Sequence, residues 1–594
     1  MRKLSSTINK LLRKETTILT PTEQLNKIKF EQGNIDIIIA KDVNIENISL
    51  KKINFNLFHL KEGYINSINE YTFQNVFKNR SYIYIYNKVV STHKNAININ
   101  YKSNLQQELD NLMSTFEGLK LFSNYNSNHN ISVKTSTFFD FYGTNYYSGG
   151  AERYLLDLHE VCKAMGYNLN VYQLANIPFF RKYHNVNVIG LCQENEKVNS
   201  SYFYMDKQTK NYIYHTYNNT ELHIYSAFQE CYPNHIGPSI GISHGISWDG
   251  PANHYSYGKD FFWENKKIYL DSSYYCNKLI SVDTNTANWF QTIDYNLGND
   301  KFHVIPNYVD TKEFKPKNSK KNDKEKIIIT YPRRLYEPRG LYIVLDIIDD
   351  ILTKYPNVEF RFIGKGFDED IKNINKKIKK WPGRIKCYNK APQEMYTVYQ
   401  QSDISLIPTL YSEGTSLSCL EALSSENIVI ATRIGGLTDI IIDGYNGYLI
   451  EPSSKSLKLK LNEILSNFDK QDTIIKNSRE SAKAFNKEKW VERWINEIKE
   501  FDLKGTSKNN ELIEIYLKNI NNISTKMLNI IKSELQKGSL IYLRFEEKLN
   551  NDNISHGLLQ VVDFDEEIVN IAKKVYVDKS ISAKVSREEE IILF

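Results

Sequence analysis

The stretch from Ile404 to Glu421 constrains the fold more than any other part of the chain. A short apolar run ends at a proline, and a loop that contains Gly414 follows it. Thr415 and Ser416 are residue types that cap helices, so a helix is expected to begin near Leu417. This order of strand, loop and helix is typical of an α/β domain.

Two glutamates frame this loop. Glu413 lies in the loop, and Glu421 lies about one turn into the expected helix. The free backbone N–H groups at the start of a helix suit a phosphate or another developing anion. Carboxylates beside such a site can accept paired hydrogen bonds from vicinal sugar hydroxyls. The pattern therefore predicts a sugar and anion site, and the alternative is a capping loop with two solvated acids.

The residues that follow extend the pattern. An Ala-Thr-Arg-Ile-Gly-Gly segment spans 431–436, and an Asp-Gly-Tyr-Asn-Gly segment spans 443–447. With them, the Glu413 to Glu421 spacing resembles the E-x7-E element of the family-four retaining glycosyltransferases, which have the GT-B fold. The resemblance extends over about residues 133–503. It implies two Rossmann-like domains with the active site in the cleft between them.

An arginine-rich loop, 332–340, follows a buried-strand pattern at 327–331 and precedes an expected helix at 341–352. Guanidinium groups bind phosphate oxygens in pairs and keep their charge, so this loop suits a diphosphate. Surface arginines are the alternative. Arg334 and Arg339 resemble the family's Arg-x4-Lys pair, with Arg339 where lysine is usual.

A glycine-rich loop ends in Gly149 and Gly150, between an expected strand at 138–142 and an expected helix at 151–165. Glycines there let the backbone approach a pyrophosphate, although an ordinary turn has the same appearance. The segment is similar to the family's Gly-Gly-x-Glu element, where the first helix faces the donor and acceptor.

His244 stands at the end of a short apolar strand, with Asp249 close behind it. A lone histidine is often structural. In the family, however, a histidine on the matching loop meets the sugar or the acceptor, and Asp249 is a weaker acceptor-side candidate. The Pro-Asn-Tyr-Val-Asp segment at 306–310 resembles a family element that usually has glycine at the position of Tyr308.

The chain has 594 residues, enough for several domains. We predict a β-rich module at 1–130, Rossmann-like domains at 131–316 and 327–487, a cross-over helix at 488–503 and an accessory extension at 505–594. A hydrophilic run at 317–326 is predicted to be the linker between the two Rossmann-like domains. In the extension, apolar side chains at helical spacing predict an amphipathic helix with Ile513, Leu517, Ile520, Ile523, Met527 and Ile531.

Lysine and arginine exceed aspartate and glutamate by six, 76 against 70, so the charge does not indicate a nucleic-acid partner. Six scattered cysteines indicate a cytoplasmic protein, and we expect no membrane span. Residues 1–14 form a basic amphipathic pattern that suits peripheral contact with a membrane or docking on the protein itself. Short D-x-D triplets at 368–370 and 563–565 are weak metal signals, so no metal or other cofactor is expected.

The resemblance implies a retaining glycosyltransferase that moves a sugar from a nucleotide sugar to an acceptor hydroxyl. Glu413 would hold the donor sugar, Glu421 the ribose, and His244 the sugar or acceptor. Other implied donor-binding residues are Gly149, Gly150, Arg334, Arg339, Thr415, Ser416 and Leu417. Cell-surface polysaccharide, lipid-linked sugar and protein Ser/Thr acceptors remain open, as do a glucan-acting GT-B enzyme and a non-catalytic carbohydrate-binding or scaffold protein.

Overall fold

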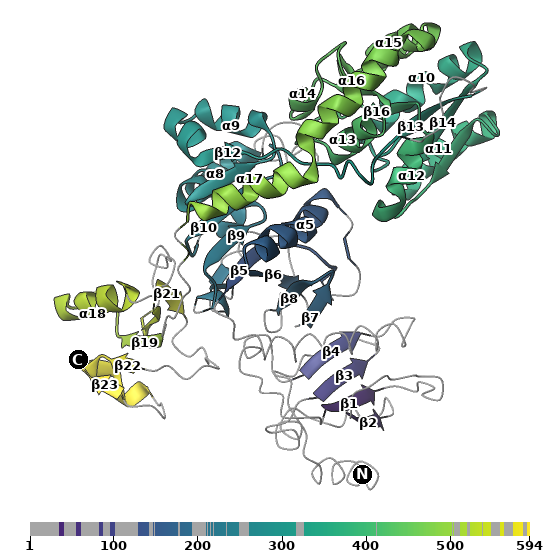
Figure 1. The fold of residues 1–594 in the computed structure, drawn as a ribbon. Coiled ribbons are helices and arrows are strands. Elements are labelled where there is room, and N and C mark those ends of the chain that lie inside the picture. Colours follow the sequence, from purple (N-terminus) through teal and green to yellow (C-terminus); the bar gives the residue numbers. More distant parts are fainter. Residues whose placement is uncertain are drawn as a thin grey trace. The chain divides into compact units, whose positions relative to one another are not determined.

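The computed structural model describes four strands within the first 128 residues and most of residues 129–593. The gaps are 142–145, 176–178, 193–208, 249–260, 317–325, 504–510, 520–522, 548–558, 563–573 and 586–590, with shorter ones between them. The expected basic helix at 1–14 and the linker at 317–325 lie outside the described residues. The described elements appear in Figure 1.

The N-terminal strands form a parallel sheet. Its order is β2-β1-β3-β4, made of β1 (Ile35–Ala40), β2 (Phe55–Leu60), β3 (Tyr82–Tyr86) and β4 (Ala96–Asn100). Runs of β-branched and aromatic residues favour strands. The runs at 35–39 and 82–86, which lie in β1 and β3, are of this kind.

The chain divides into two compact units, one of residues 1–240 with 502–594 and the other of residues 241–501. The first unit contains strands in the order β9-β5-β6-β8-β7, of which β7 is antiparallel to β8. They are β5 (Asn130–Thr135), β6 (Asn168–Ala175), β7 (Phe179–Tyr183), β8 (Val186–Cys192) and β9 (Leu222–Tyr225). Helix α5 (Gly150–Ala164) matches the predicted helix and ends before Gly166, whose φ is +81°.

The strand predicted at 138–142 is wrong, because the strand of this region is β5. The backbone N–H groups of Phe138 and Phe139 donate to the side chain of Gln173, at 3.1 and 2.6 Å, instead of to a neighbouring strand. Both phenylalanines are buried. Their apolar character thus reflects burial of a loop and not a place in the sheet.

The C-terminal residues of the first unit form a second parallel sheet, of order β21-β20-β19-β22-β23. Its elements are β19 (Leu512–Leu517), α18 (Thr525–Gln536), β20 (Leu540–Phe545), β21 (Leu559–Val562), β22 (Lys574–Val577) and β23 (Ile591–Leu593). The predicted helix from Ile513 to Ile531 is correct only in its second half. Every residue of β19 is buried: Ile513, Ile515 and Leu517 lie on one face, and the other face holds Leu512, Tyr516 and Glu514, which is ion-paired with Arg544.

The second unit contains a six-stranded parallel sheet of order β15-β14-β13-β16-β17-β18. Its strands are β13 (Ile327–Tyr331), β14 (Val358–Ile363), β15 (Ile385–Tyr388), β16 (Ile404–Ile407), β17 (Ile428–Thr432) and β18 (Tyr448–Ile450). The strand expected at 327–331 is confirmed. The same unit holds β11 (Lys278–Ser281), β12 (Phe302–Val304), α8 (Phe261–Tyr275) and α9 (Thr284–Gln291), and β10 (Ser239–Ser243) spans the point in the chain where the first unit ends and the second begins.

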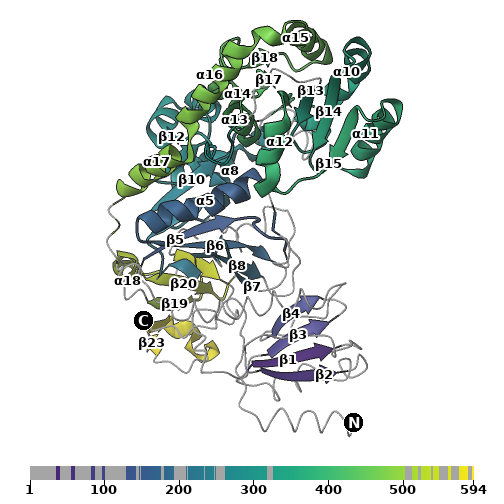
Figure 2. The ribbon, with the colours of Figure 1, turned by 45° about the vertical axis from the view of Figure 1, so that its right-hand side comes forward.

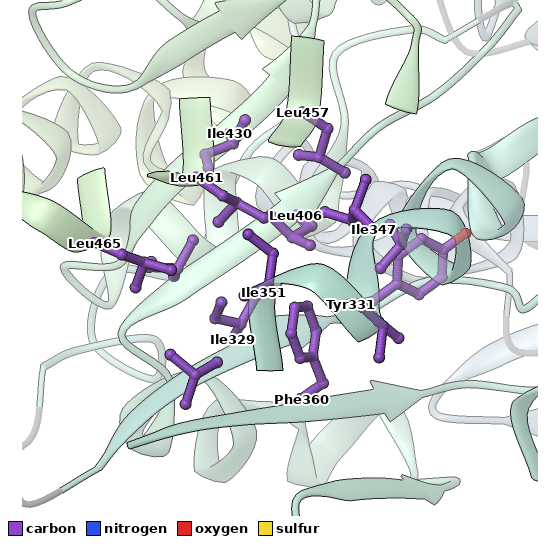
Figure 3. Close-up of a cluster of buried hydrophobic side chains, with 14 of the residues drawn as sticks. Ile329, Tyr331, Ile347, Ile351, Phe360, Leu406, Ile430, Leu457, Leu461 and Leu465 are labelled. Atoms are coloured by element: carbon purple, nitrogen blue, oxygen red, sulfur yellow. The ribbon is translucent and has the colours of Figure 1, made fainter. Parts of the chain in front are cut away.

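Both faces of this sheet are covered by helices. On one face, side chains such as Leu406 and Ile430 pack with α10 (Leu341–Lys354) and α15 (Ser454–Ser466), as Figure 3 shows. On the other, Ile407 and Val429 pack with α13 (Leu417–Ser424) and α12 (Met395–Gln401). Consecutive strand residues point to opposite faces, so the continuous apolar runs of β16 and β17 follow from burial on both sides.

The last helix of the second unit, α17 (Lys487–Lys499), follows α16 (Asp472–Ala482), and both are labelled in Figure 2. Glu497 Oε2 lies 2.8 Å from Lys278 Nζ and 2.9 Å from His303 Nδ1. The ring of Trp490 lies 4.4 Å from that of Tyr308. Helix α17 covers most of the helix predicted at 488–503, and Tyr308 serves as a packing residue. None of the described helices has the length and apolar character needed to cross a membrane.

The strand order of this sheet changes direction at one point, between β13 and β16. Numbered along the chain, the order is 3-2-1-4-5-6, so the direction of winding reverses between β13 and β16. Ligands of such sheets bind outside the carboxyl ends of the strands at this reversal. The arginine-rich loop follows β13 and the Glu413 loop follows β16. The topology therefore brings the two loops singled out in the sequence to one place.

The core of this sheet provides a matched stability test on a single helix. Leu461 of α15 is fully buried, whereas Leu459 of the same helix is 62% exposed. We expect Leu461→Ala to lower the free energy of unfolding of this unit by about 3 kcal/mol and Leu459→Ala by less than about 0.5 kcal/mol. Denaturant titration of the full chain measures both, and equal effects would contradict the packing described.

Candidate functional site

One carboxylate oxygen joins the loops after β13 and β16. Glu413 Oε2 accepts a hydrogen bond from Arg333 Nη2 at 2.6 Å and another from Arg339 Nη1. Thr409 Oγ1 donates to the same oxygen at 3.0 Å and itself accepts from Arg333 Nη1. These four residues are called the Glu413 cluster. Charge-assisted bonds of this kind are the stronger ones in proteins.

The members of the cluster differ in exposure. The side chain of Arg333 is 6% exposed and that of Glu413 10%, whereas Arg339 keeps 29%. Burial by itself raises the pKa of Glu413, but Arg333 and Arg339 outweigh it and hold that pKa below its ordinary value. The Glu413 carboxylate in turn raises the pKa of Arg339. At neutral pH the cluster therefore carries two positive charges and one negative charge.

Glycines allow the backbones around the cluster to approach one another. A Cβ on Gly340, where φ is +79°, would lie 1.8 Å from the carbonyl oxygen of Pro408. A Cβ on Gly435 would lie 2.2 Å from the carbonyl oxygen of Glu413, which accepts from Gly436 N at 2.9 Å. Only glycine fits at these two positions. The Gly-Gly segment thus supports the backbone of Glu413.

The three arginines of the loop after β13 differ in their contacts, and the binding of a diphosphate by Arg334 and Arg339 stays a prediction. Arg339 contacts Glu413, but its partner in the cluster is Arg333, while Arg334 is exposed. The sequence offered three arginines in one loop, and their spacing alone did not distinguish the one that turns inward. Arg333 is therefore a residue of the site that sequence reasoning missed.

The start of α13 is where the sequence predicted it, but the expected capping is wrong. Ser416 occupies the N-cap position without a side-chain capping bond. Thr415 Oγ1 instead donates to the carbonyl of Val282, at 2.6 Å, and accepts from the backbone N–H of Asn307, at 2.7 Å. Because Leu417 then begins the helix without a side-chain cap, its first-turn N–H groups remain suited to an external anion.

The second glutamate lies inside the protein. Glu421 is the fifth residue of α13 and is only 3% exposed. Its helical position agrees with the sequence analysis, and its contact with a ligand stays a prediction.

His244 lies beside the Glu413 loop. It directly follows β10 and is half-buried. A Cβ on Gly414 would stand 2.9 Å from the carbonyl oxygen of His244, so the two backbones are in close contact. Asp249, the weaker acceptor-side candidate, lies outside the described residues.

Asp283, two residues after the end of β11, is a second residue that the sequence did not single out. It is fully buried at the N-cap of α9, where Oδ1 accepts from Thr286 N at 2.7 Å. A Cβ on Gly245 would lie 3.2 Å from its other oxygen. Burial, aided by the charge of Asp439, raises the pKa of Asp283 to about 6.

Gly149 and Gly150 belong to the first compact unit. Gly149 is the N-cap of α5, and no side chain caps this helix. The loop therefore presents a glycine backbone at a helix start, as the sequence predicted, and its contact with a donor stays a prediction.

Metal-ligand groupings were also sought. Among the residues that the structure describes, no cluster of three His, Cys, Asp or Glu side chains could hold an ion. Asp368 and Asp370 lie in the first turn of α11 (Asp368–Lys380), where acids favour the helix, and Asp370 accepts from the hydroxyl of Tyr342 at 2.7 Å. The triplet at 563–565 lies outside the described residues.

The Glu413 cluster lies in the part of the chain that matches a known family. Residues 311–481 match the family model described as Glycosyl transferases group 1. The matched range contains both loops of the cluster.

Relatives of known sequence agree with this match. An uncharacterized glycosyltransferase of Methanocaldococcus jannaschii is 31% identical over 160 residues, which is 26% of this chain and 42% of that protein. The lipopolysaccharide 1,2-N-acetylglucosaminetransferase of Salmonella typhimurium is 25% identical over 175 residues, 27% of this chain and 45% of that protein. The similarity thus spans less than half the length of these curated relatives.

A solved structure shows the fold of a larger part of the chain. The sucrose-phosphate synthase of Thermosynechococcus elongatus superposes with a TM-score of 0.51 at 16% identity, over 63% of this chain and 98% of that one. The chain has the GT-B fold, as the sequence predicted.

Asp283 generates a prediction on the pH dependence of stability. A carboxyl with a raised folded pKa binds its proton more tightly in the folded state, so stability is lost as pH rises from about 4 through about 6. Asp283→Asn keeps a capping side chain and has no charge to bury. Relative to this variant, we expect the free energy of unfolding of the unmodified protein to fall by on the order of 2 kcal/mol between pH 4.5 and 7.5.

Thermal and denaturant unfolding at the two pH values measures this difference. Asp368→Asn, at an exposed helix start, is the control for loss of one aspartate and should show a much smaller pH-dependent difference. A difference for Asp283→Asn that is independent of pH would contradict the assigned burial of this carboxylate.

Proposed function

We propose that the protein is a glycosyltransferase that moves a sugar from a nucleotide-diphosphate sugar to an acceptor hydroxyl with retention of anomeric configuration. The observation that carries the proposal is the Glu413 cluster, located at the reversal of strand order within the range that matches the group 1 family model. A net positive site beside an uncapped helix start is suited to a diphosphate.

The main barrier in such a transfer is separation of charge. The anomeric carbon becomes positive, while negative charge accumulates on the leaving diphosphate. Preorganised cations and backbone N–H groups stabilise that charge with little rearrangement. Arg339, the exposed Arg334 and the start of α13 at Ser416 and Leu417 would supply them, without a metal ion.

The carboxylate of Glu413 has one oxygen available for the sugar. Every hydrogen bond that its side chain makes with the described residues falls on Oε2. Oε1 would accept hydrogen bonds from donor-sugar hydroxyls, and Glu421 would accept from the ribose. His244 would orient the sugar or the acceptor. Gly149 and Gly150 are proposed as backbone donors to the nucleotide sugar.

Synthesis of a cell-surface polysaccharide or glycoconjugate is the proposed setting. The Salmonella typhimurium relative is named as a lipopolysaccharide N-acetylglucosaminetransferase. By similarity to that relative, we propose a comparable acceptor for this chain. A cytoplasmic enzyme with peripheral contact at the inner face of the membrane through residues 1–14 would fit a lipid-linked acceptor.

The direct test is a screen of nucleotide sugars by thermal shift, followed by an assay for nucleoside-diphosphate release with carbohydrate, lipid-linked and peptide acceptors. We expect stabilisation by one nucleotide sugar, release of its diphosphate, and a product with the same anomeric configuration by NMR. Binding without release would indicate a non-catalytic protein, and an inverted product would contradict the retaining mechanism.

Substitution of the two glutamates separates their roles. Glu413→Gln is expected to lower the rate of transfer by about a hundredfold or more, because it removes a contact to the reacting sugar. Nucleotide affinity should stay or rise, since Arg339 loses a competing carboxylate. Glu421→Gln should weaken nucleotide affinity by about tenfold through its lost ribose contact.

Isothermal titration with the nucleoside diphosphate and initial rates measure the two effects. Glu451→Gln, at an exposed position after β18, is the control that should change neither. Equal loss of nucleotide affinity in the Glu413 and Glu421 variants would refute the division of roles.

A further inference from the structure

Arg333 is the most enclosed cation of the Glu413 cluster, and the function proposed above gives it no task. Its Nη2 bonds to Glu413 and its Nη1 to Thr409. Thr409 is fully buried, and the Arg333 side chain is 6% exposed. Both bonds lead to the loop after β16, so this guanidinium is fixed by groups of the protein.

A single arginine suffices to neutralise one carboxylate, yet Glu413 Oε2 has two. The second guanidinium therefore provides a positive charge in excess of what Glu413 requires. Exposure distinguishes the two arginines: Arg339 has about five times the exposed fraction of Arg333, 29% against 6%. Of the pair, Arg339 is thus the one placed to contact a ligand.

We propose that Arg333 is a positioning residue, a resident counter-ion for Glu413 that allows Arg339 to leave this carboxylate for the diphosphate of a nucleotide sugar. The inference rests on the proposed function and adds a device to its donor site. On binding, Arg339 exchanges its bond to Oε2 for bonds to phosphate oxygens. Arg333 stays, so Glu413 remains ionised and oriented toward the sugar.

The energetic reason is the position of Glu413. Its carboxylate is nearly enclosed, and an enclosed charge that loses its last cationic partner is strongly destabilised. With Arg333 present, Arg339 can depart without leaving the charge unpaired. Without Arg333, Arg339 would be the last cation of Glu413, and a diphosphate would have to compete with that carboxylate for it.

This account makes a prediction for a residue that does not touch the ligand. Arg333→Met should weaken the binding of inorganic pyrophosphate by about tenfold or more, because Arg339 is then retained by Glu413. Adding Glu413→Gln should release Arg339, and the double variant should regain affinity to within about threefold of the unmodified protein. Isothermal titration with pyrophosphate at constant ionic strength measures each constant.

A matched control is available in the same domain. Arg361 is 11% exposed and pairs with Glu359 at 2.7 Å, outside the cluster. Arg361→Met removes a comparably enclosed guanidinium and should leave pyrophosphate binding unchanged. Arg333→Lys keeps the charge and is expected to bind pyrophosphate more tightly than Arg333→Met. Arg333→Gln, which also removes the charge, replaces Arg333→Met if the latter does not fold.

The outcomes separate the inference from the function on which it rests. Absence of pyrophosphate binding by the unmodified protein would contradict the proposed donor site itself. If that protein binds and Arg333→Met binds equally well, the counter-ion role is wrong. If the double variant stays as weak as Arg333→Met, Arg333 contacts the phosphate directly and the proposed exchange is overturned.

Discussion

The structure of the candidate site depends on one carboxylate oxygen shared by two arginines. Arg333 and Arg339 come from the loop after β13, and Glu413 comes from the loop after β16. Their attraction offsets the cost of enclosing Glu413, which is why its pKa lies below the ordinary value despite burial. Because two cations serve one anion, the site has positive charge to offer a phosphate.

The parallel sheet explains why these loops meet. Strands β13 and β16 are neighbours, although Ile404, the start of β16, lies 72 positions after Pro332, the first residue after β13. Apolar side chains on both faces hold the sheet between two layers of helices. Glycines at 340 and 435 then let the loops come closer than any side chain would permit. The packed sheet thus places the two loops side by side, and the glycines allow their backbones to come close enough for the Glu413 cluster to form.

Sequence patterns predicted much of this arrangement. Continuous apolar runs such as 327–331 identified buried strands, and the Glu413 to Glu421 spacing identified the loop and the start of α13. The patterns gave wrong predictions where the spacing of apolar residues did not distinguish a helix, a strand and a buried loop. The apolar residues of β19 are buried on both faces and resembled half of an amphipathic helix, while Phe138 and Phe139 lie in a loop and resembled a strand.

The site was predicted less completely than the fold, because side-chain direction is a tertiary property. Arg333 and Arg334 are adjacent in sequence, yet one is enclosed with Glu413 and the other is exposed. Thr415 has a residue type that caps helices, but its hydroxyl bonds to Val282 and Asn307 instead. Asp283 and its raised pKa follow from burial beside Gly245, which no spacing in the sequence indicates.

The most direct measurement of the central claim is a crystal structure of the protein grown with pyrophosphate. The account predicts pyrophosphate at the carboxyl ends of β13 and β16, with Arg339 on a phosphate oxygen and Arg333 still bonded to Glu413. Pyrophosphate bound elsewhere, or Arg333 turned away from Glu413 toward the phosphate, would contradict it.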